Sequence, residues 1–484
     1  MTPGEPILNM PPSPTLFDPL LHVGRTDAES PRDTIAALAT PSGNSALALI
    51  RVSGPACRRI AGQIFEREPQ QLVERRPVYA TYRSATGHLL DDLVWVFLPG
   101  PRTATAEDTL ELTPHGNPLI AQLILEDLFY RGCRAAEPGE FTRRSFLAGK
   151  IDLTQAEAVM DLIHARSERA LAVAQRQLRG GLGKVVERLI GELLLVLARI
   201  EVYVDFPDED LPPEDRQEVM ASLREVLRGT KRLLATERFG GLLRDGVKTV
   251  LLGAPNAGKS SLLNAFVGRS RALVGPEPGT TRDFLEERLQ VGPHMLRLID
   301  TAGLNPLPGA LERQGMAKTL ECLIEADLVL WVLDATQLST DLDPVYSEHL
   351  VAGKVIVVLN KSDLGDVTKF DRLGVPYPVL AVSALTGAGM AELGSEIVRL
   401  VEGYAPDVSG AEEVAVNARH AEALRRTTLM LERVISGFSA QSVSPIELIS
   451  SDLRCALDAL GEIAGRVDHE RMLDALFANF CIGK

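Results

Sequence analysis

Apolar and polar residues alternate over short stretches in the first third of the chain. Residues 33–54 favour two short strands around a polar turn that contains Pro41, Gly43 and Asn44. Residues 93–99 and 108–116 have the composition of further strands, and residues 118–133 have the length and apolar density of a helix that begins at a proline. The pattern predicts a mixed α+β unit over residues 29–149.

The apolar period then changes to three and four residues, which is the period of a helix with one buried face. One such stripe covers residues 156–178, and a second covers 189–204, where the acidic, proline-containing segment 205–215 interrupts it. A third helix is predicted from about residue 216 to 237, and helical stripes return over 424–438 and 449–467.

Between these helical stretches, from residue 246 to about 403, short apolar strands alternate with helices, which is typical of a parallel sheet. Helices on both sides of this unit favour one helical domain into which the α/β unit is inserted, and two separate helical pieces are the alternative. We predict a disordered extension at 1–28, the α+β domain at 29–149, a discontinuous helical domain at 150–240 and 404–484, and the α/β domain at 241–403.

The amino-acid composition favours a soluble globular protein over a membrane or secreted protein. Of 484 residues, 45% are hydrophobic and 24% charged, as in soluble globular proteins, and no apolar run approaches the roughly 20 residues of a membrane helix. The N-terminal residues lack the basic segment of a secretory signal. The net charge of −14 argues against a broad nucleic-acid surface, though RNA remains compatible with one local patch or a partner subunit. Five scattered cysteines favour a reducing, cytoplasmic location over a zinc site or disulfide scaffold.

The strongest chemical signal is VLLGAPNAGKSSLLNAF at residues 250–266. It contains G-x-x-x-x-G-K-S between an apolar strand and a helix, where Gly253 and Gly258 leave room for backbone N–H groups around phosphate oxygens. Lys259 then reaches the terminal phosphates, and Ser260 provides a hydroxyl to Mg²⁺. The segment predicts a phosphate-binding loop.

Further motifs follow in the order expected of a GTPase. GTTRD at 279–283 offers Thr281 as a second Mg²⁺ ligand, and LIDTAG at 298–303 places Asp300 near the metal. VLNKSD at 358–363 positions the carboxylate of Asp363 to accept from the N1 and N2 protons of guanine, and VSALTG at 382–387 completes the base pocket. The predicted GTP-binding residues are Asn256, Ala257, Gly258, Lys259, Ser260, Ser261, Gly275, Thr280, Thr281, Asp300, Thr301, Ala302, Gly303, Asn360, Lys361, Asp363, Ser383, Ala384 and Leu385.

The residue after D-x-x-G indicates how hydrolysis must differ from that of Ras. A glutamine orients the attacking water there in Ras-like GTPases, whereas this chain has Leu304, which cannot do so. Hydrolysis therefore needs another group to position water and another positive charge at the β–γ bridge. Glu312 lies in the same switch region, and Asn256 lies inside the phosphate loop.

Nearly the whole chain from residue 33 to 484 resembles the MnmE family, also called TrmE, of tRNA uridine-modification GTPases. The most specific matches are GAPNAGKSSLLN, GTTRD, residues 138–163, DFPDE and the terminal FCIGK. The resemblance implies a Ras-like P-loop G domain that pairs with a second copy and uses a potassium ion as the missing positive charge. It implies a water-orienting role for Glu312, although the loop 304–313 differs from the family's usual charged sequence. The implied potassium ligands are Asn256, Gly275, Glu277 and Thr280.

The resemblance also assigns chemistry to the first domain. It implies a folate-binding, dimerising domain in which a tetrahydrofolate derivative, in its 5-formyl or methylene form, contacts Arg51, Glu111, Lys150 and Lys484. A glutamate suits the N–H edge of a pterin, and cations suit folate carboxylates. Without the resemblance, Arg51 and Lys150 would be interpreted as solvated surface charges, and Glu111 as a strand residue facing solvent.

Cys481, in the terminal CIGK, admits three interpretations. A lipid-anchor motif fits poorly, because Gly483 is not aliphatic and Lys484 is not a usual last residue of C-a-a-X. A buried structural cysteine fits the apolar helical run before it, whereas a reactive thiol fits a tail in which Gly483 ends the helix. The resemblance favours the third interpretation, a catalytic Cys481.

Taken as a whole, the resemblance implies a cytoplasmic homodimer that acts on tRNA in a heterotetramer with an FAD-dependent subunit, MnmG, also called GidA. The pair would add an aminomethyl or carboxymethylaminomethyl group at C5 of wobble uridine, with carbon from folate and with FAD held by the partner. No membrane association is expected. The alternative from another class is a non-catalytic GTPase switch in ribosome assembly, although no basic RNA-binding segment is evident.

Overall fold

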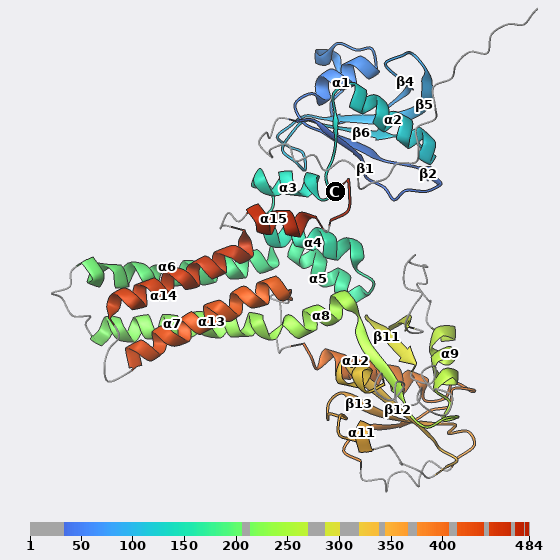
Figure 1. The fold of residues 1–484 in the computed structure, drawn as a ribbon, viewed down its shortest axis with the longest axis vertical. Coiled ribbons are helices and arrows are strands. Elements are labelled where there is room, and N and C mark those ends of the chain that lie inside the picture. The colour runs from blue at the N-terminus through green and yellow to red at the C-terminus, as the bar shows by residue number, and fades with distance from the viewer. Residues whose placement is uncertain are drawn as a thin grey trace, which may run out of the picture. The chain divides into compact units, whose positions relative to one another are not determined.

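The computed structural model describes residues 33–205, 213–269, 286–300, 319–337, 344–365, 375–405, 414–439, 445–465, 470–478 and 480–483. The chain forms two compact units: one comprises the residues up to Glu137 together with Gly483, and the other comprises the residues from Pro138 to Ile482. Figure 1 draws the chain in colours that run from its N-terminus to its C-terminus.

The first unit is an α+β domain. Its elements are β1 (Ile35–Leu38), β2 (Ser45–Leu47), β3 (Ile50–Ser53), α1 (Cys57–Ile64), η1 (Pro69–Gln71), β4 (Val78–Arg83), β5 (Leu89–Leu98), β6 (Thr109–Thr113), β7 (His115–Gly116), α2 (Pro118–Tyr130) and β8 (Arg134–Ala135). Six strands form one sheet in the order β4-β5-β6-β3-β1-β8, with only the β1–β8 pair parallel. Strands β2 and β7 form a separate two-stranded ribbon.

Two sequence predictions for this unit have different outcomes. Residues 33–54 form three strands rather than the predicted two, because Ser45–Leu47 pairs with His115–Gly116 outside the main sheet. The predicted helix that begins at Pro118 is confirmed. The Asn117 side chain caps it by accepting from the N–H of Leu119 at 2.9 Å.

The core of the first unit is rich in aromatic side chains. Trp95 is fully buried and stacks on Phe65 with their ring centroids 4.3 Å apart. Tyr82 is also fully buried, and its hydroxyl donates to Asp127 at 2.8 Å, which ties α2 to β4. Burial and the neighbouring carboxylate raise the pKa of Tyr82, so this hydroxyl remains a donor.

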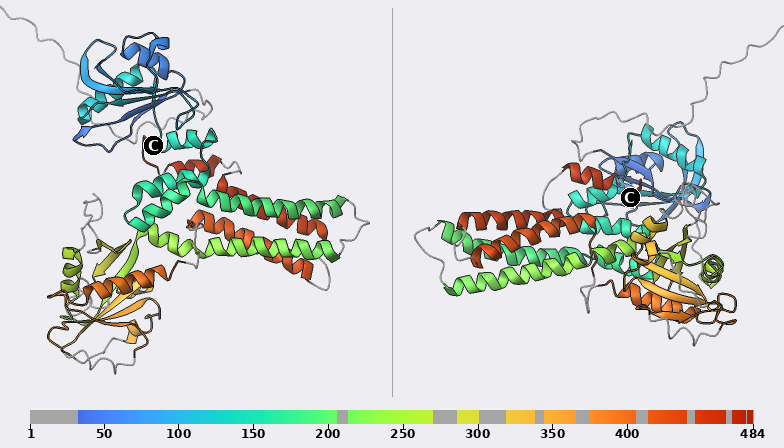
Figure 2. Two further views of the ribbon diagram at one scale, coloured as in Figure 1. Left: turned by 180° about the vertical axis from the view of Figure 1, so that it is seen from behind. Right: turned by 60° about the horizontal axis from the view of Figure 1, so that its bottom comes forward.

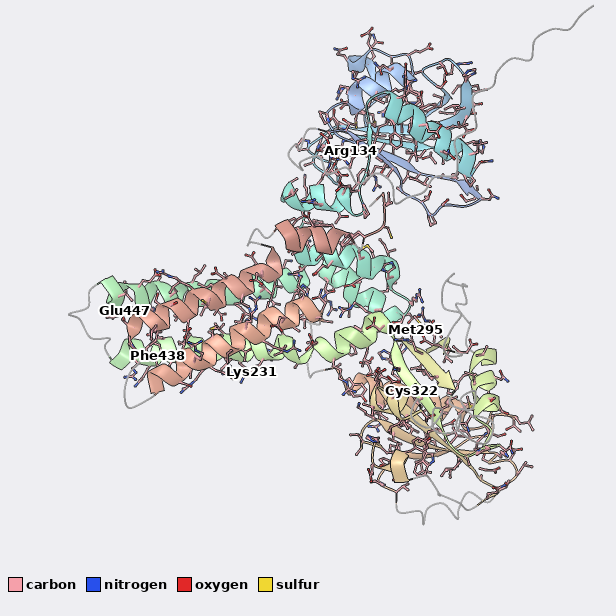
Figure 3. The ribbon with its side chains drawn as sticks, viewed as in Figure 1. Arg134, Lys231, Met295, Cys322, Phe438 and Glu447 are labelled. Atoms are coloured by element: carbon pink, nitrogen blue, oxygen red, sulfur yellow. The ribbon has the colours of Figure 1, made fainter. Side chains whose placement is uncertain are left out.

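The second unit contains helices on both sides of an α/β segment in the chain. The helices before it are α3 (Glu140–Leu147), α4 (Leu153–His164), α5 (Glu168–Leu178), α6 (Gly181–Asp205), α7 (Pro213–Ala235) and α8 (Glu237–Asp245), and those after it are α13 (Ala418–Ser439), α14 (Ile446–Ala464) and α15 (Glu470–Phe477). Helices α6, α7, α13 and α14 lie side by side as a bundle in Figures 1 and 2. Figure 3 labels Lys231 on α7 and Phe438 on α13 within this bundle.

One apolar core joins the helices from both sides of the α/β segment. It contains Leu189 and Val226 from the first group of helices, and Leu424, Leu453 and Leu460 from the second. The insertion of the α/β segment into one helical domain is therefore confirmed, and the alternative of two separate helical pieces is wrong. Within the described part of the chain, no helix combines the length and apolar character needed to cross a membrane.

One predicted helix is divided in the structure. The stripe over 156–178 forms α4 and α5, because Ala165 leaves the helical conformation with ψ of 121°. The Ser167 side chain then caps α5 by accepting from the N–H of Ala170 at 3.2 Å. The helix predicted from about residue 216 to 237 is confirmed as α7, which ends at Ala235, and a further helix, α8, begins at Glu237.

Within the described residues, the inserted segment is an α/β domain with a six-stranded sheet. Its elements are β9 (Val247–Leu252), α9 (Lys259–Arg269), β10 (Glu286–Val291), β11 (His294–Asp300), β12 (Leu328–Asp334), α11 (Pro344–Ser347), β13 (Val355–Asn360), β14 (Val379–Ala381) and α12 (Met390–Glu402). The strand order is β10-β11-β9-β12-β13-β14, and all neighbours are parallel except β10 and β11. All residues of β13 are buried, as expected for a parallel sheet covered on both faces.

Candidate nucleotide site

The carboxyl ends of the parallel strands bring the predicted nucleotide-binding segments to one edge of the sheet. Strand β9, which leads into the glycine-rich loop, is flanked by β11 and β12. The register pairs Asp300, the last residue of β11, with Leu251 of β9, and Asp334, the last residue of β12, with Asn360 of β13. Ligands of open parallel sheets bind at this edge.

The loop after β9 requires glycine at two positions. Gly253 has φ of 151°, and a Cβ there would lie 2.2 Å from the carbonyl oxygen of Val332. Gly258 has φ of 93°, and its Cβ would lie 2.1 Å from the side-chain nitrogen of Asn360. Both positions are closed to any larger residue, so the motif glycines shape the loop as the sequence predicts.

The first turn of α9 places the predicted phosphate-binding groups at a helix N-terminus. Lys259 is buried, and its Nζ donates to the carbonyl oxygens of Gly253 at 2.7 Å and Ala254 at 3.0 Å. Ser260 and Ser261 follow it and are exposed. A cradle of loop N–H groups at a helix start, beside a lysine, fits the phosphates of a nucleotide.

Asn360 is a clamp between loops. Its side chain is buried, and Nδ2 donates to the carbonyl oxygens of Ala257 at 3.1 Å and Gly258 at 3.4 Å. Its Oδ1 accepts from the N–H of Ala384 at 3.1 Å. Asn360 thus holds the phosphate loop to the loop after β14, which brings three predicted segments together.

The predicted base pocket lies on the loops after β13 and β14. The N–H of Ser362 donates to the carbonyl oxygen of Val382 at 3.1 Å, which joins the two loops. Asp363 is exposed, and within the described residues no donor bonds its carboxylate. Ser383 is fully buried, whereas the neighbouring Leu385 is 87% exposed. A carboxylate with open acceptor sites at this place suits the N–H edge of a base.

Sequence reasoning missed Asp334 at the end of β12. Its Oδ2 lies 2.5 Å from the Nζ of Lys361, and its Oδ1 accepts from both the N–H and the hydroxyl of Thr336, at 2.9 and 2.6 Å. Burial would raise the pKa of Asp334, but these bonds outweigh burial and lower it. The only signal in the sequence was an aspartate that ends an apolar strand.

Several predicted site residues lie outside the described residues. They are Gly275, Glu277, Thr280, Thr281, Thr301, Ala302, Gly303, Leu304, Glu312 and Lys484, and the side chain of Asp300 belongs with them. Of the predicted metal ligands, Ser260 and Asn256 are described; Asn256 adopts φ of 65° in the phosphate loop. Their side-chain oxygens are of the kind that Mg²⁺ and K⁺ accept. Within the described ranges, no cluster of three or more His, Cys, Asp or Glu could hold a metal.

Two of the predicted folate contacts meet in the first unit. Arg51 on β3 and Glu111 on β6 are register partners, and the guanidinium Nε and Nη2 lie 3.0 and 2.9 Å from Glu111 Oε1. Both side chains are about a quarter exposed, at 25% and 28%. Lys150 belongs to the second unit, where it is exposed.

The last described residue of the chain packs against β1 in the first unit. Gly483 has φ of 91°, and a Cβ there would lie 2.3 Å from the carbonyl oxygen of Leu38. Leu38 is the register partner of Ile50, which precedes Arg51 on β3. Gly483 therefore lies one strand away from β3, which carries Arg51 of the Arg51–Glu111 pair.

The predicted catalytic cysteine lies after α15. Cys481 is exposed, so the interpretation of a buried structural cysteine is wrong. Helix α15 ends at Phe477, so Gly483 does not end that helix as predicted. The N–H of Gly139 donates to the carbonyl oxygen of Cys481 at 3.3 Å, and a Cβ on Gly139 would lie 2.7 Å from that of Phe480. The backbone before the thiol is thus fixed against the start of α3.

Comparison with known proteins places this site and fold in a family. A family model described as the MnmE helical domain matches residues 153–481, and one described as the GTP-binding protein TrmE N-terminus matches residues 34–150. The chain is 52% identical to the tRNA modification GTPase MnmE of Opitutus terrae, over 93% of this chain and 99% of that protein. It is 42% identical to MnmE of Akkermansia muciniphila, over 94% and 99% of the two chains, and 39% identical to MnmE of Aquifex aeolicus, over 94% and 100%.

Among solved structures, the chain matches the G domain of the T. maritima FeoB iron transporter with 27% identity, covering 33% of this chain and 99% of that one, at a TM-score of 0.23. The two family models together span the described domains, and the relatives match over nearly their full length. The predicted layout of an α+β domain, a helical domain and an inserted P-loop domain is confirmed. This chain belongs to the family of tRNA modification GTPases called MnmE.

Proposed function

We propose that this protein binds and hydrolyses GTP and acts in the modification of tRNA. The observation that carries the proposal is the glycine-requiring phosphate loop at the end of β9, clamped by Asn360 to the two base loops, in a chain 52% identical to a tRNA modification GTPase. Its loop N–H groups and Lys259 bind the phosphates, and the exposed carboxylate of Asp363 selects guanine.

Hydrolysis needs ions and a water-positioning residue. Ser260 and Thr281 would hold Mg²⁺, and Asn256, Gly275, Glu277 and Thr280 would hold K⁺; these ions supply positive charge to the phosphates when bound. Leu304 cannot orient water, so this role falls to Glu312.

The modification itself would occur at C5 of wobble uridine, with an aminomethyl or carboxymethylaminomethyl group as product. We propose that a tetrahydrofolate derivative supplies the carbon and contacts Arg51, Glu111, Lys150 and Lys484. The half-buried Arg51–Glu111 pair, and the packing of Gly483 close to the same strands, support this assignment. The protein would act as a cytoplasmic homodimer with an FAD-dependent MnmG subunit.

The decisive experiment concerns Cys481. Cys481→Ser should fold, dimerise and hydrolyse GTP normally, yet fail to modify wobble uridine, because a hydroxyl ionises far less readily than a thiol. Mass spectrometry of digested tRNA measures modification, and phosphate release measures hydrolysis in the same preparation. Cys455→Ser is the matched control, because Cys455 is also exposed. Full modification by Cys481→Ser would contradict a catalytic thiol.

Guanine specificity has its own test. Asp363→Asn should weaken GTP binding by about 2–3 kcal/mol, the order of a hydrogen bond to a charged group. The new amide can donate to the 2-oxo group of xanthine, so XTP binding should improve in the same variant. Unchanged GTP affinity in a fluorescent-nucleotide titration would exclude the assigned base pocket.

Potassium dependence is tested by ion replacement. Hydrolysis should be much faster in K⁺ than in Na⁺ at equal ionic strength, and Glu312→Ala should slow hydrolysis while leaving nucleotide binding nearly intact. Equal rates in the two salts would rule out the potassium mechanism. The second candidate, a non-catalytic switch in ribosome assembly, predicts that loss of the protein leaves the wobble nucleosides unchanged.

A further inference from the structure

Gly139 begins α3 in a backbone conformation that is unusual at the start of a helix. Its φ is 66° and its ψ is 7°, which is the left-handed region, and no side chain caps the helix there. Helices α4 and α5 begin after Asp152 and Ser167, whose backbones are extended and whose side chains accept from helix N–H groups. Extended backbone with such a cap is the usual way to begin a helix, so the start of α3 needs another explanation.

The space that a side chain would take at Gly139 is filled by the end of α15 and by the C-terminal segment, residues 480–483. A Cβ at Gly139 would lie 2.7 Å from the Cβ of Phe480 and 3.0 Å from the carbonyl oxygen of Phe477. The N–H of Gly139 donates to the carbonyl oxygen of Cys481 at 3.3 Å. Only glycine adopts the left-handed conformation without a steric cost and also leaves this space open. The start of α3 is therefore shaped to receive the C-terminal segment.

Two further contacts hold the same segment. Phe480 is buried in an apolar cluster with Phe477 and residues of α4, and the ring centroids of the two phenylalanines are 5.1 Å apart. One turn along α3, Arg143 Nη2 lies 3.1 Å from Oδ1 of Asp474 on α15. Figures 1 and 2 show α15 next to α3. The residue before Cys481 is thus anchored in a core, whereas Cys481 itself is exposed.

These contacts leave the Cys481 thiol little freedom. The N–H of Phe480 donates to the carbonyl oxygen of Phe477 at 3.0 Å, and the carbonyl oxygen of Cys481 accepts from Gly139. Because the backbone is held on both sides of the Cys481 Cα, the sulfur moves mainly by rotation about χ1, among three staggered positions. A thiol restricted in this way meets a substrate from a defined direction.

We propose that Gly139 is a positioning residue for the Cys481 thiol: because it lacks a side chain, the C-terminal segment can rest on the start of α3, and this fixes where the sulfur meets the substrate. The inference rests on the proposed function, in which Cys481 takes part in modification. A Cβ at position 139 must push the segment away by about 1 Å to restore the ordinary separation of about 3.5–4.0 Å between carbon atoms. A misplacement of about 1 Å can lower a reaction rate about 10²-fold.

The test compares Gly139→Ala with Gly180→Ala in the full chain, reconstituted with its proposed partner subunit. Gly180, between α5 and α6, also has a positive φ, of 81°, but a Cβ there would have its nearest contact at 3.7 Å. The control therefore has the same kind of backbone strain without displacing a neighbour. Gly139→Ala should lower kcat for wobble-uridine modification about 10²-fold, with KM for tRNA and GTP hydrolysis unchanged. Gly180→Ala should leave all three unchanged. Mass spectrometry of digested tRNA and phosphate release measure these quantities.

Two measurements on the folded protein follow the position of the thiol itself. Hydrogen exchange in the peptide that begins α3 should be faster in Gly139→Ala than in wild type, because the N–H of residue 139 no longer donates to Cys481. Iodoacetamide should still alkylate Cys481 in this variant, because a displaced thiol stays exposed. Protection of Cys481 from alkylation would overturn the inference, because the loss of modification would then come from burial of the sulfur.

A second variant covers the case in which Gly139→Ala loses α3. Phe480→Ala removes the buried anchor and keeps Gly139, and it should show the same selective fall in kcat. Full modification by Gly139→Ala, a rise in KM in place of a fall in kcat, or equal losses in Gly139→Ala and Gly180→Ala would overturn the inference while an inactive Cys481→Ser leaves the proposed function standing. Full modification by Cys481→Ser would instead remove the proposed function, and the inference with it.

Discussion

Glu157 and Asp161 lie one turn apart on α4 and have opposite surroundings. The carboxylate of Glu157 accepts from Arg419 Nε at 2.8 Å and Nη2 at 3.0 Å, and His420 Nε2 lies 2.6 Å from it. Asp161 has no bonded donor within the described residues and lines a cavity instead. Both are acids on the same helix, so the difference comes from what packs against each turn.

Helix α13 supplies partners to the first acid and not to the second. Arg419 and His420 lie in its first turn, and the Asn417 side chain accepts from the N–H of His420 at 2.9 Å. The N-terminal end of a helix also favours a nearby negative charge. Glu157 is therefore held by charged partners from α13, whereas the partly buried Asp161 has no hydrogen-bonded donor within the described residues.

The two environments shift the two pKa values in opposite directions. Burial would raise the pKa of Glu157, but its contacts with His420 and Arg419 outweigh burial and hold the pKa well below its ordinary value. Burial is also the largest influence on Asp161, and there it prevails, so the pKa is raised. Substitution of each acid by its amide should therefore change stability with opposite sign.

The largest expected effect is that of Glu157→Gln. It leaves Arg419 and His420 facing a neutral amide, so the free energy of unfolding of the helical domain should fall by about 3–5 kcal/mol, the usual cost of breaking a buried pair. Hydrogen exchange in peptides of α4, α13 and α14 measures this loss. A fall in the free energy of unfolding below about 1 kcal/mol would mean that the contacts of Glu157 with Arg419 and His420 do not stabilise the domain.

The same variant has a defined pH dependence. The pKa of Glu157 is lowered in the folded chain, so its stabilisation is present above the ordinary value of about 4.3 and is lost as pH falls through the folded value. The gap between wild type and Glu157→Gln should stay constant from neutral pH to about 5 and then narrow. Urea unfolding across this pH range measures the difference in free energy of unfolding between the two proteins. A difference that widens below pH 5 would contradict the lowered pKa of Glu157.

Asp161→Asn should have a smaller effect of opposite sign. Because the pKa of Asp161 is raised, folding is favoured while the group is protonated, and this advantage is lost as pH rises through the folded value. The asparagine variant should therefore be more stable at neutral pH, by about 0.5–2 kcal/mol, the range of typical stabilising substitutions. Its advantage over wild type should shrink at acid pH; destabilisation at neutral pH would show that Asp161 has a partner after all.

The smallest effect is expected at an exposed pair on the bundle. Glu218 lies 2.5 Å from Arg199, with side chains 65% and 51% exposed. Glu218→Gln should change the free energy of unfolding by less than about 1 kcal/mol, because water screens such pairs. Urea unfolding in low and high salt measures it, and a loss comparable to that of Glu157→Gln would remove the contrast between buried and exposed acids.

The sequence alone predicted those structural features that depend on residues close together along the chain. The phosphate loop followed from glycine and lysine spacing, and the helix at Pro118 followed from its apolar density and its proline. The division between α4 and α5 was missed because no glycine or proline marks it; the cap at Ser167 was the only signal. An N-cap serine inside a continuous apolar stripe is easily outweighed by the stripe.

Contacts between segments that are far apart in the sequence could not be predicted from such local patterns. The Asp334–Lys361 pair joins the ends of two strands, and Arg51 meets Glu111 through the register of β3 and β6. The cavity lined by Asp161 forms only when α4, α5 and α8 pack together. Glu312 and Lys484 lie outside the described residues, so their expected roles stay predictions.

The insertion of the α/β domain determines the order in which the protein can be completed during synthesis. Helices α6 and α7 leave the ribosome early, but the core that covers them needs α13 and α14, which follow the whole inserted domain. At about 5–20 residues per second, the apolar faces of α6 and α7 wait on the order of ten to fifty seconds for their partners. The inserted domain can fold during this interval, while the apolar faces of the first half of the bundle stay without the helices that cover them.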